Sequence, residues 1–550
     1  MNTNILFATE TGLSQEVAET IASYLVACGL RKCCVRSMDT VSIDQWELLS
    51  PLVVVCSTTG QGDPPATMRA SWEHLKMSDC PDLPNLQFAV FGLGDSTYPK
   101  YNYMGKMLHN RLRQLGGVSL VHRGLGDEQD AGGVWEGLEA FLKSLVVALR
   151  LSNEQFTSTA LAPPVLKFRS IIEDPSSFRA PFIPYPIKTT TFTIASRKQL
   201  TSSDHFQNIC HIEFERFGFD TSTVVTLHSA EDDTGISFAP AAFLSSKINL
   251  VELLVRFFDL ESCASRSLFH CLKAFCNDDE ERERLEELAS TSVQTDYLAY
   301  CYREKRNALE VLSEFPHCAI PFDYFLSQLK PMRPRMYSLS SSPSADKLNC
   351  AITVAHLQFS TPYGRARSGL CSRWLCAAAA GDKFEGFVSQ SPSRLSLEKA
   401  QPLILVGPGT GIAPMRSIIR EAAALHWKAP IYLFVGCRAP GRDYLYESEW
   451  IELQKEIKLT VVTAFSRFEG KKTYVQHRIV ESGTAEALAS LIADGGSILI
   501  CGNSKQMPRD VERAFTSVVQ HFICGGSESD AVRYVNECKR DGRYITDTWS

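Results

Sequence analysis

The 550-residue sequence lacks the features that mark membrane proteins, secreted proteins and zinc fingers. No run of about 18 apolar residues occurs, so we expect no helix that crosses a membrane and no membrane anchor. The first residues, Met1-Asn2-Thr3-Asn4, lead directly into an apolar strand, without the basic and long apolar segments of a secretory signal. The eighteen cysteines include no Cys-x-x-Cys pair, so we expect no metal site and free thiols suited to the cytoplasm.

The charge of the sequence is too small to indicate a nucleic-acid partner. The net charge is −6, and hydrophobic residues at 44% and charged residues at 21% are ordinary for a globular protein. Residues 1–150 carry 12 Lys and Arg against 16 Asp and Glu, whereas the last 150 residues carry 18 against 17. An acidic first segment favours a basic protein surface as partner, although scattered surface charge explains the counts equally well.

The order of patterns along the chain indicates an α/β multidomain protein. In residues 1–150 short apolar strands alternate with helical patterns, which is typical of a parallel sheet with helices on both faces. Ligands of such sheets bind at the carboxyl ends of the strands. The expected strands are Asn4–Ala8, Pro51–Cys56 and Gln87–Leu93, and the expected helices are Ser14–Cys28 and Lys100–Leu115.

Three further segments follow the first. Residues 151–186 are rich in proline, serine and threonine, which predicts an extended linker. Residues 187–398 open with strand patterns, which return from Arg335 to about Val388, and contain a helical stretch from about 241 to 329. We therefore expect a β domain with a helical insert there. Residues 399–550 again alternate strands and helices, as a nucleotide-binding domain does.

Three loops in the first 150 residues predict a site for a phosphate and a flat ring. The first loop opens a helix, where hydroxyl and N–H groups meet the positive end of the helix dipole. Glycines in the other two loops let a ring approach the backbone, and Tyr98 can stack on that ring. A simple helix cap explains the first loop alone, but not all three. The loops are Thr9-Glu10-Thr11-Gly12-Leu13-Ser14, Ser57-Thr58-Thr59-Gly60-Gln61-Gly62-Asp63-Pro64-Pro65 and Phe91-Gly92-Leu93-Gly94-Asp95-Ser96-Thr97-Tyr98-Pro99-Lys100-Tyr101-Asn102.

These loops resemble the FMN site of flavodoxins and of the diflavin reductases, which implies a flavodoxin-like domain. Thr59 stands where the microsomal reductase of monooxygenases has a tyrosine, which removes one aromatic stack. By the resemblance, the phosphate loop is Thr9, Glu10, Thr11, Gly12, Leu13 and Ser14; Thr58, Thr59, Gly60, Leu93 and Gly94 belong to the ring loops; Tyr98 covers one ring face; and Asn102 and Asp127 lie near the ring edge.

Two later motifs predict a second flavin. On a strand, Arg335 and Tyr337 would share one face; Arg suits a pyrophosphate, Tyr suits a flavin face, and Ser338 suits a flavin nitrogen. A second loop opens a helix, where backbone N–H groups and the Ser372 hydroxyl would meet the pyrophosphate. Together the two motifs resemble the FAD site of the ferredoxin-NADP reductase superfamily, which implies an FAD-binding β-barrel. The second loop is Gly369, Leu370, Cys371 and Ser372.

A glycine-rich turn, residues 407–411, follows an apolar strand and precedes a helix, which suits a dinucleotide diphosphate at Gly409 and Thr410. Hydroxyls and fixed positive charges downstream suit the 2′-phosphate of NADPH, although structural salt bridges would also use the cations. These residues are Arg438, Ser466, Arg467, Lys472, Tyr474 and Gln476. The superfamily resemblance further places a Ser, a Cys, an acid and an aromatic around the hydride path, here Ser338, Cys501, Asp547 and Trp549. Cys501 could equally be an apolar filler.

The order of motifs is similar to that of the diflavin reductases over essentially the whole chain. Gly-Leu-Cys-Ser-x-Trp at 369–374 and Thr-Thr-Gly-Gln-Gly-Asp-Pro-Pro at 58–65 most resemble the cytosolic NADPH-dependent diflavin oxidoreductases. That resemblance implies a monomeric reductase that passes electrons from NADPH through FAD and FMN to the iron–sulfur protein anamorsin in cytosolic cluster assembly. The alternatives are a methionine synthase reductase-like enzyme, a monooxygenase reductase-like enzyme and a non-enzymatic flavin-bound adaptor. The segment Cys210–His228 departs from the family's longer strand pair, which predicts a shortened barrel and weaker FAD binding.

Overall fold

The structure, a computed structural model, divides into two compact units. One unit comprises Met1–Pro186, Thr226–Arg333 and Thr361–Arg365, and the other Ile187–Val225, Pro334–Ser360 and Ala366–Ser550. The residues described are 2–10, 12–59, 62–96, 100–130, 133–151, 190–215, 254, 258–290, 294–330, 332, 335–346, 349–388, 395, 401–468, 470, 472–504 and 506–549. None of the helices in these ranges combines the length and apolarity needed to span a bilayer.

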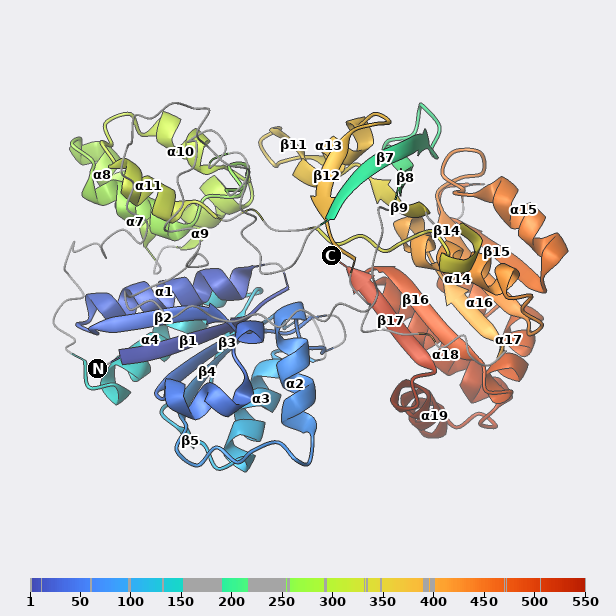
Figure 1. The fold of residues 1–550 in the computed structure, drawn as a ribbon, viewed down its shortest axis with the longest axis horizontal. Helices are drawn as coiled ribbons and strands as arrows, with labels where there is room; N and C mark the ends of the chain where they lie inside the picture. Colours follow the sequence, from blue (N-terminus) through green and yellow to red (C-terminus); the bar gives the residue numbers. More distant parts are fainter. Residues whose placement is uncertain are drawn as a thin grey trace. The chain divides into compact units, whose positions relative to one another are not determined.

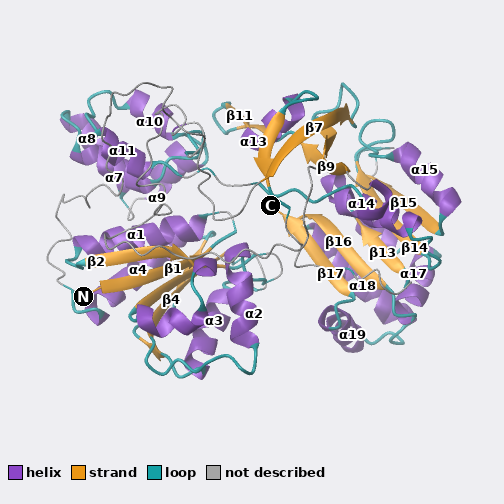
Figure 2. Ribbon diagram, viewed as in Figure 1, coloured by secondary structure: helices purple, strands orange, loops and turns teal. Residues whose placement is uncertain are grey.

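The N-terminal part of the first unit is a parallel sheet with helices on both faces (Figures 1 and 2). Its strand order is β2-β1-β3-β4-β5, and β6 pairs with β4. The strands are β1 (Asn2–Ala8), β2 (Lys32–Ser37), β3 (Leu52–Ser57), β4 (Gln87–Gly94), β5 (Val118–Ser119) and β6 (Gly124–Asp127). The helices are α1 (Leu13–Ala27), α2 (Arg69–Lys76), α3 (Tyr103–Gln114) and α4 (Val134–Ala148), with 3₁₀ turns at Met38–Thr40, Ile43–Leu49 and Ala66–Met68.

Alternation along the strands builds two cores on opposite faces of this sheet. Ile5 and Val53 pack with α1 and α4 on one face, whereas Leu6 and Val54 pack with α2 and α3 on the other. Successive side chains of a strand point to opposite faces, so a strand covered on both sides is apolar throughout. β3 shows this pattern, because all its residues from Leu52 to Cys56 are buried.

A helical segment with a core of its own belongs to the same unit. Its core includes Phe269, Leu272 and Leu285, which are fully buried. The helices are α7 (Arg266–Ala274), α8 (Asp279–Ala289), α9 (Gln294–Tyr297), the π-helical turn Leu298–Tyr302, α10 (Ala308–Glu314) and α11 (Phe322–Gln328).

The second unit begins with a small antiparallel β structure. A four-stranded sheet has the order β12-β7-β8-β9, and β10 pairs with β11. Phe192, Ile212 and Leu375 belong to the core that joins this sheet to α13. The elements are β7 (Thr190–Gln199), β8 (Ile209–Glu215), α12 (Pro343–Asp346), β9 (Asn349–Ala355), β10 (Gln358–Ser360), β11 (Ala366–Ser368), α13 (Leu370–Ala377) and β12 (Lys383–Gly386).

A second parallel sheet, of order β15-β14-β13-β16-β17, completes this unit (Figure 1). Its central strand alternates as in the first sheet: Ile404 and Val406 enter one core, and Leu403 and Leu405 enter the other. The strands are β13 (Leu403–Val406), β14 (Ile431–Cys437), β15 (Leu459–Phe465), β16 (Ser497–Asn503) and β17 (Tyr544–Trp549). The helices are α14 (Ile412–Ala424), α15 (Glu447–Glu456), α16 (Val475–Ile479), α17 (Thr484–Ala493), α18 (Met507–Phe522) and α19 (Glu528–Arg540), and a 3₁₀ turn spans Gly409–Gly411.

The predicted strand at Arg335–Ser338 is wrong. The ladder begins only at Leu339, which forms a single bridge with Ile352. Pro334 precedes the segment and has no N–H to donate to a neighbouring strand. The predicted linker lies outside the described residues, as does most of the segment expected to shorten the barrel, of which only Cys210–Glu215 is described, within β8.

Candidate functional site

The first loop of the N-terminal sheet is arranged to receive an anion. Gly12 adopts φ 109°, a left-handed conformation that glycine reaches without strain, and begins α1. Its N–H donates to Thr9 Oγ1 over 2.7 Å, and Thr9 N donates to Thr67 Oγ1 over 2.8 Å. Ser14 is fully buried, and its Oγ has no partner among the described residues. An unpartnered hydroxyl beside the N–H groups of a helix start fits a phosphate.

The other two loops are braced by hydrogen bonds among themselves. Thr58 Oγ1 accepts the N–H of Met104 over 3.1 Å at the start of α3, and Thr59 Oγ1 donates to Asp63 O over 3.1 Å. Asn102 has φ 52° and is fully buried, and its Nδ2 donates to Gly126 O over 2.9 Å. These bonds join the carboxyl ends of β3, β4 and β6, where a parallel sheet binds its ligands.

Asp127 connects the same loops through its carboxylate. Its Oδ1 accepts the N–H of Ser96 over 2.9 Å and that of Gln129 over 3.0 Å. Burial opposes ionisation, but the N–H donors of Gln129 and Ser96 outweigh it and hold the pKa of Asp127 below its usual value. Asn102 thus bonds to strand β6 and Asp127 bonds to two loops, so both side chains shape the cradle.

The other residues expected at this site differ in their burial and contacts. Gly94 is closely packed, because a Cβ there would lie 2.8 Å from Asn102 N, and Leu93 is buried behind it. Glu10 lies at the rim, 3.5 Å from Arg69 in an exposed ion pair. Thr11, Gly60 and Tyr98 lie outside the described residues.

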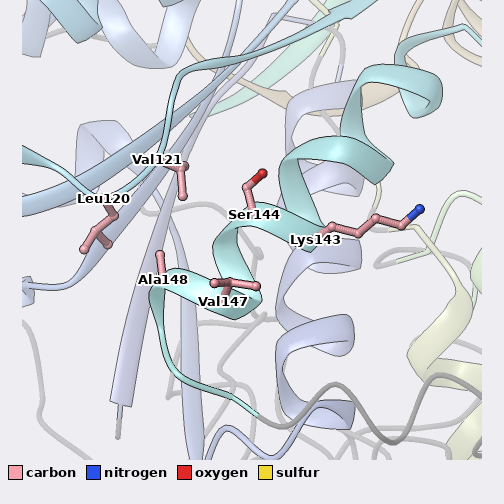
Figure 3. Close-up of a pocket in the computed structure, with 6 residues that line it drawn as sticks. All are labelled: Leu120, Val121, Lys143, Ser144, Val147 and Ala148. Carbon is pink, nitrogen blue, oxygen red and sulfur yellow. The ribbon is translucent and has the colours of Figure 1, made fainter.

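The groove drawn in Figure 3 lies elsewhere on the N-terminal sheet. Its lining comes from the residues before β6 and from the last turns of α4, hence from the amino-terminal side of the strands. The phosphate and ring loops are at the carboxyl ends, so the groove is separate from them. Its lining residues are Leu120, Val121, Lys143, Ser144, Val147 and Ala148.

In the second unit, the two expected FAD motifs meet. The Tyr337 side chain lies against Cys371, and burial together with that thiol raises the pKa of the Tyr337 hydroxyl well above its usual value. Gly369 caps α13 and accepts the N–H of Arg373 over 2.8 Å, which leaves the first N–H groups of α13, from Leu370 on, for a ligand. This arrangement fits a flavin pyrophosphate. Arg335 is exposed, and Ser338 is half-buried.

Ser372 differs from the expectation of a direct pyrophosphate contact. Its Oγ donates to Gly369 O over 3.2 Å and accepts the N–H of Leu357 over 3.1 Å. The hydroxyl therefore holds the loop against Leu357, which lies between β9 and β10. A Cβ on Gly369 would approach this hydroxyl to 2.7 Å, so glycine is needed where the loop closes.

The glycine-rich turn after β13 is tight on one side and open on the other. A Cβ on Gly411 would overlap the carbonyl of Cys501, whereas a Cβ on Gly409 would meet no atom within 4 Å. Gly409 has φ 58°, and Thr410 follows it at the start of the helical turn that leads into α14. Open backbone at a helix start fits a diphosphate.

Two arginines meet at the ends of β14 and β15. Arg467 N donates to Arg438 O over 2.9 Å, and burial and the Arg467 guanidinium together lower the pKa of Arg438. The guanidinium of Arg438 lies 3.2 Å above the ring of Phe206, and the backbone N–H of Arg438 donates to the Asp443 carboxylate. Like charges held together in this way favour a dianion between them.

The other residues expected to bind the nucleotide are either exposed or bonded to protein groups. Lys472 and Tyr474 are exposed, and Ser466 Oγ donates weakly to Cys437 O over 3.4 Å. Gln476 Nε2 instead donates to Asp510 over 3.4 Å. Thr67, Phe206 and Asp443 were not among the residues predicted for these sites. Of these only Asp443 had a signal, an acid directly after the turn Pro-Gly-Arg.

Strand pairing joins three of the four residues expected around the hydride path. Cys501 and Asp547 are register partners on β16 and β17, and Trp549 ends β17 opposite Asn503. Burial, with Asp547 adding to it, raises the pKa of Cys501 well above its usual value, so the thiol stays protonated. Trp549 is 37% exposed, and its carbonyl accepts the N–H of Ser504 over 2.8 Å. No contact described here joins Ser338 to these three.

Comparison with known proteins finds three domain families along the chain. The family model for flavodoxin matches residues 5–140, that for the FAD binding domain matches 214–374, and that for the oxidoreductase NAD-binding domain matches 405–513. Proteins called NADPH-dependent diflavin oxidoreductase 1 are similar over 99% of both chains, with 32% identity in Schizosaccharomyces pombe and 33% in Danio rerio and Mus musculus. The chain belongs to the NADPH-dependent diflavin oxidoreductase family.

As a diflavin oxidoreductase, the protein is an enzyme with FMN, FAD and NADPH as cofactors, and it transfers electrons to a protein acceptor. The predicted fold class, with flavodoxin-like, FAD-binding and nucleotide-binding parts in that order, is confirmed. The diflavin oxidoreductase has a site that fits each cofactor: the Ser14 pocket for FMN phosphate, the α13 start beside Tyr337 for FAD, and the Arg438–Arg467 pair for NADPH.

Proposed function

We propose that this diflavin reductase delivers electrons to the iron–sulfur protein anamorsin in cytosolic iron–sulfur cluster assembly. The observation that carries the proposal is the similarity to proteins called NADPH-dependent diflavin oxidoreductase 1 along 99% of both chains. The resemblance of residues 58–65 and 369–374 to the cytosolic branch of the family supports it. None of the eighteen cysteines, all of which are described, forms a disulfide, which suits a reducing compartment such as the cytosol.

When bound, FAD would supply hydride acceptance from NADPH and FMN would supply one-electron transfer, so the two flavins would join a two-electron donor to a one-electron acceptor. In our proposal Arg438 and Arg467 hold the 2′-phosphate, while Gly409 and Thr410 present backbone N–H groups to the diphosphate. Cys501 keeps its proton at Sγ beside Asp547, and Trp549 and Ser338 border the nicotinamide position. Their roles rest on the superfamily resemblance and on the pairing of β16 with β17.

We further propose four functional segments: an FMN domain at 1–150, a linker at 151–186, an FAD domain with its helical insert at 187–398, and a nucleotide domain at 399–550. A proline-rich tether would give the FMN domain a high effective concentration near FAD and still let it reach an external partner. The reductase acts as a monomer in this scheme, and the acceptor is the only other protein it needs.

The test uses the full-length enzyme loaded with both flavins. Purified iron–sulfur protein anamorsin, a haem monooxygenase and methionine synthase are offered as acceptors under anaerobic conditions, and the rate of each acceptor's reduction by NADPH is followed spectroscopically. We expect anamorsin to be reduced fastest at equal acceptor concentration. Faster reduction of either other acceptor would contradict the proposed partner and leave the reductase activity intact. An Asp443→Asn enzyme, with a loosened NADPH loop, should slow all three in proportion.

A further inference from the structure

Cys276, Glu281 and Cys318 converge in the helical segment, outside the flavin and nucleotide loops. One ligand atom from each, the two Sγ atoms and a carboxylate oxygen, lie within 4.8 Å of one another. Cys276 is 5% exposed and Cys318 is half-buried. Two thiols and a carboxylate at this spacing are the donor types that bind a transition metal.

The backbone fixes the two thiols side by side. Cys276 and Cys318 form an isolated antiparallel bridge. The N–H of the residue after each cysteine donates to the carbonyl of the residue before the other, over 3.1 and 2.9 Å. This is the non-hydrogen-bonded type of antiparallel pair, in which the side chains approach most closely. The pairing therefore brings both Sγ atoms to one point without help from a ligand.

Glu281 reaches the same point from the first turn of α8. Its Oε2 lies 3.8 Å from Cys276 Sγ, and its N–H is fixed by the N-cap Asp278 over 2.9 Å. His317 adds a fourth donor, because its Nδ1 lies 2.7 Å from Glu281 Oε1 and its N–H donates to Oε2 over 3.2 Å. The imidazole is 62% exposed, and it becomes a fourth ligand only if it turns from the Glu281 carboxylate toward the thiols.

A cation would offset the negative charges that the cluster gains when its thiols ionise. Two thiols and a carboxylate face one another, and losing either thiol proton would place like charges together. Arg282 donates to the carbonyl of Cys276 over 2.9 Å, but its charge is paired with Asp279. A divalent metal would hold the thiolates and the carboxylate together, and sulfur with imidazole favours zinc over calcium or magnesium.

We propose that Cys276, Cys318, Glu281 and His317 form a zinc site that ties the end of α7, the first turn of α8 and the loop after α10. Four ligands leave no open position, so the zinc is structural and takes no part in electron transfer. Its binding energy adds to the stability of the helical segment, since the unfolded chain does not hold the four donors together.

A second close thiol pair in the same segment is a matched control. Cys263 and Cys301 have Sγ atoms 3.7 Å apart. Cys301 Sγ donates to the carbonyl of Ala264, and Lys305 and Lys330 are the cations that act on Cys263. Both pairs therefore have two thiols close together. Among the described residues, a carboxylate and an imidazole lie beside Cys276 and Cys318 but are not grouped with Cys263 and Cys301.

The experiment measures zinc in the full-length flavoprotein, expressed with zinc and passed through a weak chelator. We expect one zinc per chain in the wild type, its loss in Cys276→Ser/Cys318→Ser, and its retention in Cys263→Ser/Cys301→Ser. His317→Ala should keep the zinc but release it at a lower chelator concentration. No zinc in the wild type, or equal loss in both double variants, would overturn the site.

X-ray absorption at the zinc edge keeps the proposal testable if a double variant fails to fold. The wild-type protein should show two sulfur neighbours at about 2.3 Å and two nitrogen or oxygen neighbours. Four sulfur neighbours, or none, would contradict the assigned ligands. Flavin content should be the same in the wild type and in Glu281→Gln, because the site lies outside the flavin loops.

Discussion

The two parallel sheets of this enzyme meet their ligands in different ways. In the N-terminal sheet the loop groups bond to one another: Asn102 to Gly126, Asp127 to Ser96 and Gln129. In the C-terminal sheet the loops leave Gly409 open and hold two guanidinium groups of like charge side by side. A braced cradle suits a flavin that stays bound, whereas an open turn near two arginines of like charge suits a nucleotide that enters and leaves at every turnover.

The largest effect is expected from removing the side-chain amide of Asn102, which braces the loops at the FMN site. Asn102→Ala leaves the buried Gly126 carbonyl without its donor and forces alanine into the left-handed conformation. We expect a stability loss of about 2–4 kcal/mol and loss of FMN with FAD retained. Thermal unfolding and the ratio of released flavins measure both. Asn102→Gly, which tolerates the conformation, should lose less, and Asn110→Ala on the exposed face of α3 should behave as wild type. FMN retained at the wild-type ratio in Asn102→Ala would contradict the bracing.

Arg467→Ala should affect the open site without affecting the flavins. Only NADPH presents a 2′-phosphate dianion, and a charge-assisted contact contributes about 1.5–3 kcal/mol, so NADPH should weaken about ten- to hundredfold and NADH far less. Steady-state kinetics with both nucleotides give the answer. The control is Arg442→Ala, which removes an exposed arginine paired with Asp204 over 3.3 Å. Equal weakening of NADPH and NADH would make Arg467 a structural residue.

Salt should have a smaller effect, a several-fold change in rate. It should slow electron transfer to the acceptor more than flavin reduction by NADPH. Residues 1–150 carry a net −4 and the last 150 a net +1, so a basic acceptor would dock on the first segment. Raising the ionic strength from about 0.01 to about 0.1 M shortens the Debye length from about 30 to about 10 Å. Reduction of the acceptor should slow, while flavin reduction at saturating NADPH should change less. An acceptor rate independent of salt would favour apolar docking.

The smallest expected effect concerns pH and Asp127. Its folded pKa is depressed, so its contribution to stability is present above the unfolded pKa of about 3.9 and is lost as pH falls through the lower folded pKa. Asp127→Asn cannot ionise and should lack this pH-dependent part. Denaturant unfolding should therefore show wild type and variant converging as the solution is acidified, and diverging toward neutral pH. Parallel curves over that range would mean that the carboxylate adds no stability.

Local patterns in the sequence predicted the elements and the loops well. The predicted strand Gln87–Leu93 differs from the structure by one residue at one end, and the predicted helix Ser14–Cys28 differs by one residue at each end. Continuous apolar residues mark the strand in the sequence, and a glycine marks the start of the helix. The glycine-rich turn after β13 was also predicted from the sequence. The structure shows why Gly411 is needed there, because a Cβ would overlap the Cys501 carbonyl.

What the sequence could not predict are the partners across the fold. Ser372 was expected to face a pyrophosphate, but its hydroxyl has Leu357 and Gly369 as partners. Arg438 stacks on Phe206, more than 200 positions earlier in the chain, and no local pattern announces that contact. The same holds for Cys276 and Cys318: their spacing matches no metal motif, and only the bridge between their backbones brings them together.

The contrast between a resident and an exchanging ligand is tested most directly by exhaustive dialysis of the full-length protein saturated with FMN, FAD and NADP⁺. Released cofactors are then separated and quantified against protein. The braced and open sites predict FMN and FAD in a ratio near one to one, with NADP⁺ removed. FMN lost together with NADP⁺, or a single flavin species retained, would contradict the account.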